Sequence, residues 1–147
     1  MREEVLDGIR RHIHPLGGFE KAQLLIAEER HIRLRILVEE NGLNLYGHLH
    51  GGYIFTLCDS ISGMCAYSHG MTNVTQQGSI NFIRGFQTGL LFVEAHTLHK
   101  GRKTAVIRVE VTSEEGKLIA SGNFSMFLGE PVGKIFYGWR EKRNSGT

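Results

Sequence analysis

Apolar and polar residues alternate with the period of a β-strand in several segments of the chain. The clearest alternation runs through residues 31–38, where Ile32, Leu34, Ile36 and Val38 share one face. Because successive side chains of a strand point to opposite faces, this pattern predicts a strand with one face against a core. Similar patterns predict further strands over residues 20–28, 73–84, 90–99, 103–112 and 117–128. The last four follow one another closely, so we expect an antiparallel meander.

Residues 51–68 have a helical period instead. Apolar residues recur there three and four positions apart, at Ile54, Leu57, Cys58, Ile61 and Cys65. The opposite side carries Phe55 and Ala66 and is not polar either, which predicts a helix that is buried all round. A shorter amphipathic helix is predicted over residues 3–12.

Together these elements predict an α+β fold in which an antiparallel sheet wraps around the long central helix. Such a sheet leaves an exposed edge, so dimerisation by edge pairing is expected. The 147 residues contain no internal repeat or linker and predict one domain over residues 1–147, with its core at about 20–128 and a basic tail at 129–147.

Composition excludes several classes of function. The net charge of +2 is too small to indicate a nucleic-acid-binding protein by itself, and no apolar run reaches the length of a membrane span. The charged start of the chain lacks the apolar stretch of a signal peptide. Cys58 and Cys65 lie roughly 10 Å apart along the predicted helix, too far for a disulfide. We therefore expect reduced thiols and a cytoplasmic location.

Asp59 is the only residue with a formal charge at neutral pH between Asn41 and Ile83. At 22% charged residues, roughly nine would be expected in that stretch. Burying a carboxylate without partners costs several kcal/mol, so its presence in a buried helix needs a reason. One reason is a structural hydrogen bond, and the other is catalysis, which we favour.

His50-Gly51-Gly52 stands at the predicted start of the same helix. Free backbone N–H groups and the positive end of the helix dipole meet there, and glycine allows a carbonyl oxygen to approach closely. This arrangement suits an oxyanion hole, although the two glycines could also serve tight packing alone. Gly51 and Asp59 are roughly 12 Å apart along the helix axis, so one helix cannot supply both groups to one carbonyl. Two helices of a symmetric dimer can.

The segment from Asn44 to Gly52, followed by Leu57 and Asp59, resembles the signature of hotdog-fold thioesterases of the phenylacetic-acid-degradation type. The resemblance implies hydrolysis of acyl-coenzyme A without a cofactor, by dimers or dimers of dimers that share each active site between two subunits. Asp59 would then activate water or attack the thioester directly.

The same resemblance assigns further residues. The N–H of Gly51 would polarise the thioester carbonyl, and Asn44 would position the thioester or the water. Thr75 falls where relatives carry a small hydroxyl residue near the acid. His50 is expected to anchor the loop before the helix. With His48 it gives too few ligands for a metal site, and none is expected there.

Arg84-Gly85 stands where relatives often carry a small residue and a proline. Arg84 could meet a phosphate of coenzyme A or reshape the acyl pocket. Lys100, Arg102 and Lys103 share one predicted turn, which is either a solvated hairpin or a phosphate clamp for the nucleotide. Two rival functions are a hotdog protein that binds acyl-coenzyme A without turnover, which would not need Asp59, and a dehydratase, which would need a differently spaced His and acid.

Overall fold

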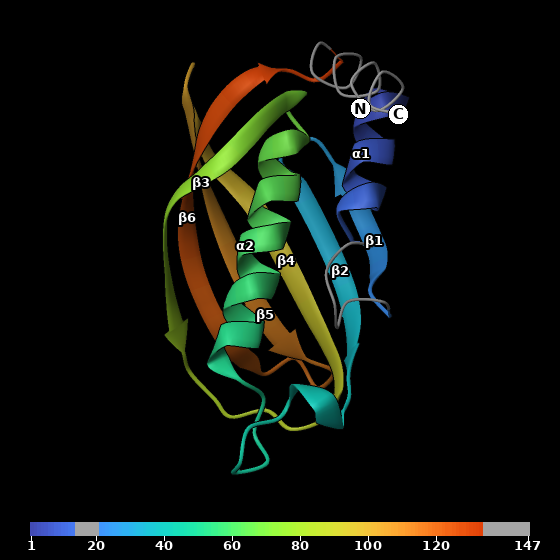
Figure 1. Cartoon of the computed structure of the whole chain (residues 1–147), viewed down its shortest axis with the longest axis vertical. Coiled ribbons are helices and arrows are strands. Elements are labelled where there is room, and N and C mark those ends of the chain that lie inside the picture. The colour runs from blue at the N-terminus through green and yellow to red at the C-terminus, as the bar shows by residue number, and fades with distance from the viewer. Residues whose placement is uncertain (14–20, 134–147) are drawn as a thin grey trace, which may run out of the picture.

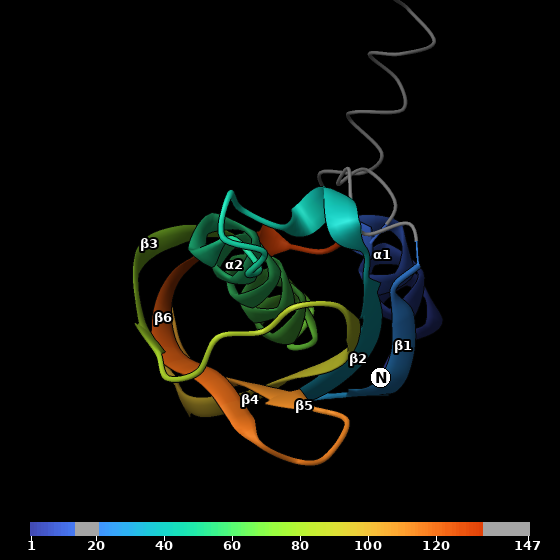
Figure 2. The same ribbon diagram turned by 90° about the horizontal axis from the view of Figure 1, so that it is seen from below.

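A computed structural model describes residues 1–13 and 21–133 of the chain. A six-stranded antiparallel sheet curls around one long helix, α2 (Gly51–Tyr67), which lies in its concave face (Figures 1 and 2). The predicted architecture, an antiparallel sheet wrapped around a central helix, is confirmed. The end of the basic tail lies outside the described residues.

The remaining elements lie close to their predicted bounds, apart from the short 3-10 helix η1, which was not predicted. They are α1 (Glu3–Ile13), β1 (Gln23–Glu28), β2 (His31–Val38), the 3-10 helix η1 (Glu40–Gly42), β3 (Met71–Phe82), β4 (Gly89–Lys100), β5 (Thr104–Ser113) and β6 (Leu118–Pro131). The strand order across the sheet is β1-β2-β4-β5-β6-β3.

The predicted four-strand meander is wrong at β3. Only β4, β5 and β6 follow one another as neighbours, whereas β3 lies at the far edge and pairs with β6. The segment after β3 crosses the open end of the sheet, where the N–H groups of Ile83 and Arg84 both donate to the carbonyl of Ile119. Alternation along a strand identifies its buried face but not its neighbour, which explains the error.

The core forms between α2 and the concave face of the sheet. The alternating strand residues Ile36, Val93, Ile107 and Phe124 are fully buried there, together with Ile61 of the helix. Each of these side chains contributes roughly 1.5–3 kcal/mol by leaving water. The sheet and the helix therefore stabilise each other, and the helix position is fixed by packing rather than by local propensity.

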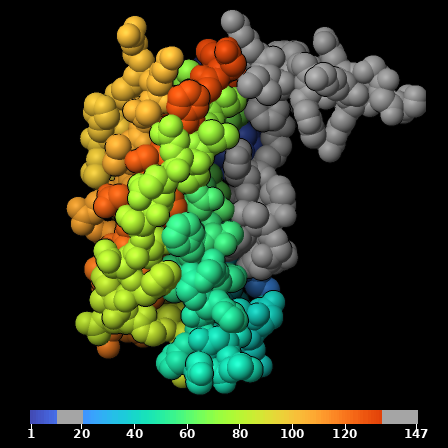
Figure 3. Space-filling view, turned by 60° about the vertical axis from the view of Figure 1, so that its left-hand side comes forward, coloured from blue at the N-terminus to red at the C-terminus, as the bar shows by residue number. Residues whose placement is uncertain are grey.

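The prediction that α2 is buried all round is wrong in its first half. Gly52, Phe55 and Thr56 are exposed, and Phe55 keeps 39% of its surface accessible. The sheet covers only one side of these turns, and the other side reaches the surface beside β3, as Figure 3 shows. On β3 itself, Val74 is 64% exposed. An apolar strip along α2 and β3 thus faces outward in the single chain.

Among the described residues, no helix is long and apolar enough to cross a membrane.

Candidate active site

The loop before α2 is organised by the side chain of Asn44. Its Oδ1 accepts hydrogen bonds from the backbone N–H groups of Tyr46 at 2.9 Å and His48 at 3.1 Å. The Asn44 N–H in turn donates to the His48 carbonyl at 2.7 Å. These bonds close a tight turn of the kind that asparagine favours. In the single chain, the side-chain oxygen Oδ1 of Asn44 therefore shapes the loop that leads into the helix.

His50 is the N-cap of α2 and acts through its backbone. Its N–H donates to the Gly42 carbonyl at 3.1 Å, and its carbonyl accepts from Tyr53 and Ile54 at 3.1 and 3.2 Å. Its side chain makes no capping hydrogen bond. Its main chain thus joins the loop to the first turn of α2, and the expected anchoring role of the His50 side chain stays a prediction. Because it fixes the first turn, the amide of Gly51 lies at the open start of the helix, where N–H groups have no partner within the helix.

Two glycines at this end allow aromatic rings to approach closely. A Cβ atom added to Gly51 would lie 3.3 Å from the ring of Phe82, at the end of β3. A Cβ atom added to Gly85 would lie 3.0 Å from Nδ1 of His48. The Arg84-Gly85 segment therefore packs against the loop that leads into α2, which places Arg84 at the same end of the molecule as Gly51.

Asp59 is held by a hydroxyl from the neighbouring strand. Oγ1 of Thr75 donates to Oδ1 of Asp59 at 2.6 Å. Thr75 lies beside an irregularity in the pairing of β3 with β6, where the register shifts between Thr75 and Gln77. Irregularities of this kind re-aim side chains. One helical turn further on, Nδ2 of Asn73 donates to the carbonyl of Gly63 at 3.1 Å.

Asn73 was missed by the sequence analysis. The available signal was a second polar residue two positions before Thr75 on the same strand, but strand alternation alone does not distinguish a helix-facing amide from a solvated one.

The two cysteines are unsuited to nucleophilic attack at neutral pH. Burial, and secondarily the charge of Asp59, raises the pKa of Cys58 to about 12. Burial raises the pKa of Cys65 to about 11, although a hydrogen bond with Thr97 opposes this. Both thiols are free and buried, as predicted. The reactive form of cysteine is the thiolate, so neither residue is a candidate nucleophile.

Cys65 belongs instead to a buried polar network at the C-terminal end of α2. Its Sγ lies 3.3 Å from Oγ1 of Thr97, which also lies 3.0 Å from Nε2 of His69. Burial lowers the pKa of His69, although Glu29 at 3.5 Å opposes this. The neutral imidazole of His69 and the protonated thiol of Cys65 both form hydrogen bonds with the Thr97 hydroxyl. This structural arrangement ties the end of α2 to β4.

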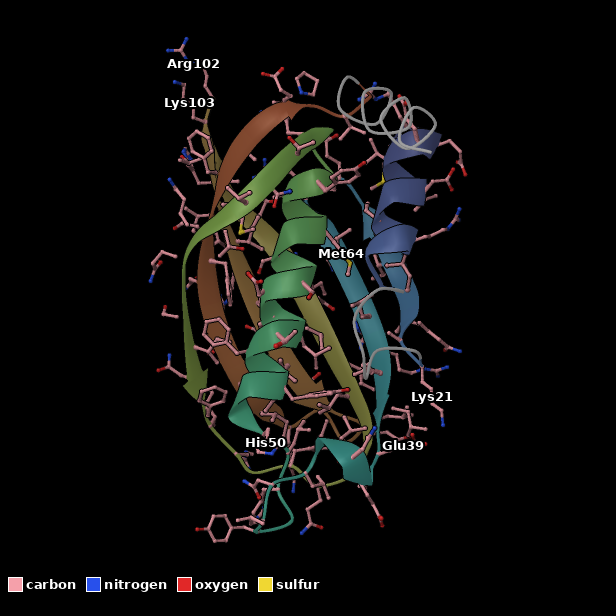
Figure 4. All side chains as sticks on the ribbon, viewed as in Figure 1. Lys21, Glu39, His50, Met64, Arg102 and Lys103 are labelled. Atoms are coloured by element: carbon pink, nitrogen blue, oxygen red, sulfur yellow. The ribbon has the colours of Figure 1, made fainter. Side chains whose placement is uncertain are left out.

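The predicted coenzyme A-binding residues lie at two opposite ends of the folded molecule. Figure 4 shows Arg102 and Lys103 at the end opposite His50. The turn that also contains Lys100 connects β4 to β5, whereas Arg84 lies at the His50 end. Within a single chain, the structure brings Asp59 and Thr75 into contact and keeps Gly51, Asn44 and His50 together two helical turns away. The basic turn joins neither group.

Comparison with known proteins identifies the family. Residues 46–120, about half of the chain, match the family described as the thioesterase superfamily. The chain belongs to the thioesterase superfamily. The matched residues extend from the loop before α2 into β6, so they contain both the helix start and Asp59. The resemblance to hotdog thioesterases that the sequence predicted is confirmed.

Several named proteins are similar in sequence to this chain. Acyl-coenzyme A thioesterase 13 of Mus musculus is 34% identical over 114 residues, which cover 75% of this chain and 81% of the mouse protein. A putative esterase of Archaeoglobus fulgidus is 32% identical over 67% of this chain and 65% of its own length. Acyl-coenzyme A thioesterase PaaI of Escherichia coli is 32% identical over 53% of this chain and 56% of its own.

Solved structures agree with the fold. A Streptococcus mutans protein bound to acetyl CoA superimposes with a TM-score of 0.76 at 38% identity, covering 82% of this chain and 98% of that one. A hypothetical thioesterase from Streptococcus pneumoniae with coenzyme A superimposes with a TM-score of 0.79 at 32% identity. The superposition covers 86% of this chain and 98% of the pneumococcal chain. Two further structures of the pneumococcal protein carry alanine in place of one aspartate and of one threonine, and those two positions are 16 residues apart.

Proposed function

We propose that the protein hydrolyses acyl-coenzyme A thioesters and that Asp59 is the acid at which hydrolysis occurs. The observation that carries this proposal is the 2.6 Å hydrogen bond between Thr75 and Asp59 on the open side of α2. These residues are 16 positions apart, the spacing of the aspartate and threonine replaced in the pneumococcal thioesterase. Coenzyme A in that protein and acetyl CoA in its S. mutans relative support the substrate class.

The hydrogen bond suggests how Asp59 works. Thr75 binds Oδ1 and fixes the orientation of the carboxylate, whose remaining lone pairs can accept a proton from water. In one route, water attacks the thioester carbon, its proton passes to Asp59, and the C–S bond breaks as the coenzyme A sulfur takes that proton. In the other, the carboxylate attacks the carbon itself and the C–S bond breaks, so that coenzyme A leaves as its thiolate. Water then hydrolyses the resulting anhydride, which regenerates the carboxylate and supplies a proton to the thiolate. In both routes the carbonyl oxygen becomes negative and is stabilised by the Gly51 N–H.

A second copy of the chain is needed to complete this site. Gly51 and Asp59 of one helix are roughly 12 Å apart along its axis, whereas both must contact one carbonyl group. Phe55 of α2 and Val74 of β3 are exposed, and β3 is an edge strand of the sheet. Figure 3 shows α2 and β3 side by side at the surface. A two-fold axis that pairs β3 with its own copy buries the apolar strip along α2 and β3 and sets the two helices side by side in opposite directions. We infer that each site takes Asp59 and Thr75 from one subunit and Gly51 and Asn44 from the other.

The same symmetry gives the separated basic residues a common location. Antiparallel pairing of the two β3 strands reverses one chain relative to the other. The end that carries Arg84 in one subunit therefore lies at the end that carries Arg102 and Lys103 in its partner. Arginine suits bidentate binding of phosphate, so these residues are proposed to bind the nucleotide of coenzyme A. Association into a dimer of dimers and a cytoplasmic location stay predictions.

The test is hydrolysis of a panel of aromatic and aliphatic acyl-coenzyme A thioesters, measured by the release of the free coenzyme A thiol. We expect turnover of at least one class by the wild-type protein and loss of turnover in Asp59→Asn. Coenzyme A binding should persist in that variant. Binding without turnover by the wild-type protein would instead indicate a non-catalytic acyl-coenzyme A-binding protein, and would overturn the proposed activity.

A further inference from the structure

The convex face of the sheet, turned away from α2, carries a compact group of ionisable side chains. The pairing of β2 with β4 puts His31 directly opposite His96, and Glu94 lies two residues earlier on the same face of β4. The imidazole rings stack with centroids 4.1 Å apart and planes at 18°. Their Nε2 atoms both approach Oε1 of Glu94, at 3.3 Å from His31 and 2.9 Å from His96.

We propose that His31, Glu94 and His96 bind a divalent transition-metal ion such as Zn²⁺. Among the described residues, their ligand atoms form a group of three that all lie within 4.8 Å of one another. Ligands at about 2.1 Å from a tetrahedral Zn²⁺ ion lie about 3.4 Å from each other, close to the observed separations from the carboxylate. Two imidazoles and one carboxylate are donors that Zn²⁺ accepts.

Small side-chain rotations are sufficient to point both nitrogens at one ion. Stacked rings direct their lone pairs nearly parallel, so the imidazoles must splay apart about their Cβ–Cγ bonds. The side chain of His96 is 50% exposed and free to do this. Nε2 of His31 is buried and has no hydrogen-bond partner of good geometry. Its 3.3 Å contact with Glu94 is not aligned as a hydrogen bond, and a metal ion would give this buried nitrogen a well-directed partner.

The carboxylate is already oriented by a neighbour. Nε of Arg33 lies 3.1 Å from Oε2 of Glu94, which leaves Oε1 toward the imidazoles. The Arg33 guanidinium is itself held over the ring of Phe92, 4.8 Å from its centroid. Burial raises the pKa of Glu94, but the two neighbouring imidazoles, His96 and His31, outweigh it and lower the pKa overall. Partners that orient a ligand in this way strengthen metal binding.

The charges around the group balance. Arg108 on β5 stands opposite His96 but donates to Glu110 at 2.7 Å, so its charge is paired. Arg33 is paired with Glu94. A shallow depression beside the group is lined by Glu94, His96, Leu98, Arg108 and Glu110. It leaves room for water to complete the coordination, as expected for three protein ligands.

The experiment is calorimetric titration of Zn²⁺ into tag-free protein that has been treated with a chelator. At pH 7 we expect one ion per chain and a rise in melting temperature, because an ion that binds only the folded state stabilises it. His31→Ala and His96→Ala should each weaken binding at least about 10-fold. His99→Ala, an exposed histidine of the same strand outside the group, is the matched control and should bind like wild type. Binding should weaken toward pH 5.5, since protonated imidazoles cannot coordinate.

The proposal is overturned if folded wild-type protein shows no saturable binding, or if His31→Ala and His96→Ala bind as tightly as wild type. Circular dichroism establishes that the variants fold, and His31→Gln replaces His31→Ala if that variant does not. Hydrolysis by metal-free protein should be unchanged in His96→Ala, because the group lies on the face of the sheet away from Asp59. Failure of the metal site is therefore distinguishable from failure of the proposed hydrolysis.

Discussion

The Thr75 hydroxyl donates a 2.6 Å hydrogen bond to Oδ1 of Asp59, and so joins the edge strand β3 to the central helix. Asp59 is half-buried and lies one helical turn after the exposed residues Phe55 and Thr56 of α2. A short hydrogen bond to a charged acceptor is stronger than one between neutral groups. It fixes the orientation of the Asp59 carboxylate relative to β3.

Replacing Asp59 should remove most of the activity. We expect Asp59→Asn to lower kcat by at least about 100-fold, because the amide can neither accept the proton of water nor attack. Thr75→Val should lower kcat by about 10-fold through loss of orientation, whereas Thr75→Ser keeps the hydroxyl and should stay close to wild type. Steady-state hydrolysis gives the values. Near-wild-type turnover by Asp59→Asn would refute the assignment.

Two inactive variants should complement each other if the site is shared. Proline is tolerated at the first position of a helix and removes the N–H, so Gly51→Pro should inactivate without disrupting α2. Gly51→Ala also adds a Cβ atom close to the Phe82 ring but keeps the backbone N–H, so it is the matched control. After subunit exchange between Gly51→Pro and Asp59→Asn, about one quarter of wild-type activity should return, since random pairing leaves one intact site in half of the dimers. No recovery despite demonstrated exchange would contradict the shared site.

The basic residues should affect binding rather than chemistry. We expect Arg84→Ala, and the triple change of Lys100, Arg102 and Lys103 to alanine, to raise KM for acyl-coenzyme A by about 10-fold, with a smaller effect on kcat. The KM for a short thioester without the nucleotide should not change in these variants. Salt should weaken the binding of only the full substrate. Equal effects on both substrates would show that these residues do not bind the nucleotide.

The close approach of β3 to β6 should depend on a glycine. A Cβ atom at Gly122 would lie 2.3 Å from the carbonyl oxygen of Ser79 and 3.0 Å from Cγ1 of Ile80. Gly122→Ala should therefore lower the free energy of unfolding by about 1–3 kcal/mol, measured in guanidinium chloride. Ser121→Ala changes the neighbouring residue, whose side chain points to the other face, and should have little effect. Similar midpoints for the two variants would contradict this packing.

The thiols should be protected in the folded protein. Because the pKa values of Cys58 and Cys65 are raised to about 12 and about 11, both thiols stay protonated at pH 8. We expect no reaction with a disulfide reagent in the native state and reaction of both cysteines after unfolding. The raised pKa values also contribute stability that is complete below pH 9 and is lost as the pH rises from 9 toward 12. Rapid native labelling of either thiol would contradict the burial.

The pattern of residues along the chain was sufficient to predict most of the elements and to single out Asp59. Alternation over residues 31–38 predicts the strand that forms there, since period-two burial is a local property of the backbone. The helix of residues 51–68 and its single charge, Asp59, were equally visible. Thr75, in contrast, was expected only from resemblance to a family, because nothing in its local pattern indicates a carboxylate partner.

Which strands and side chains meet could not be predicted from local patterns and depends on how the whole chain packs. The placement of β3 beside β6, the exposure of Phe55 and the meeting of His31 with His96 all depend on strand order. Local periodicity specifies which face of an element is buried, but not which element covers it or how far that cover extends. Contacts between residues distant in sequence are selected by packing of the whole chain, and these contacts build both the candidate active site and the group on the convex face.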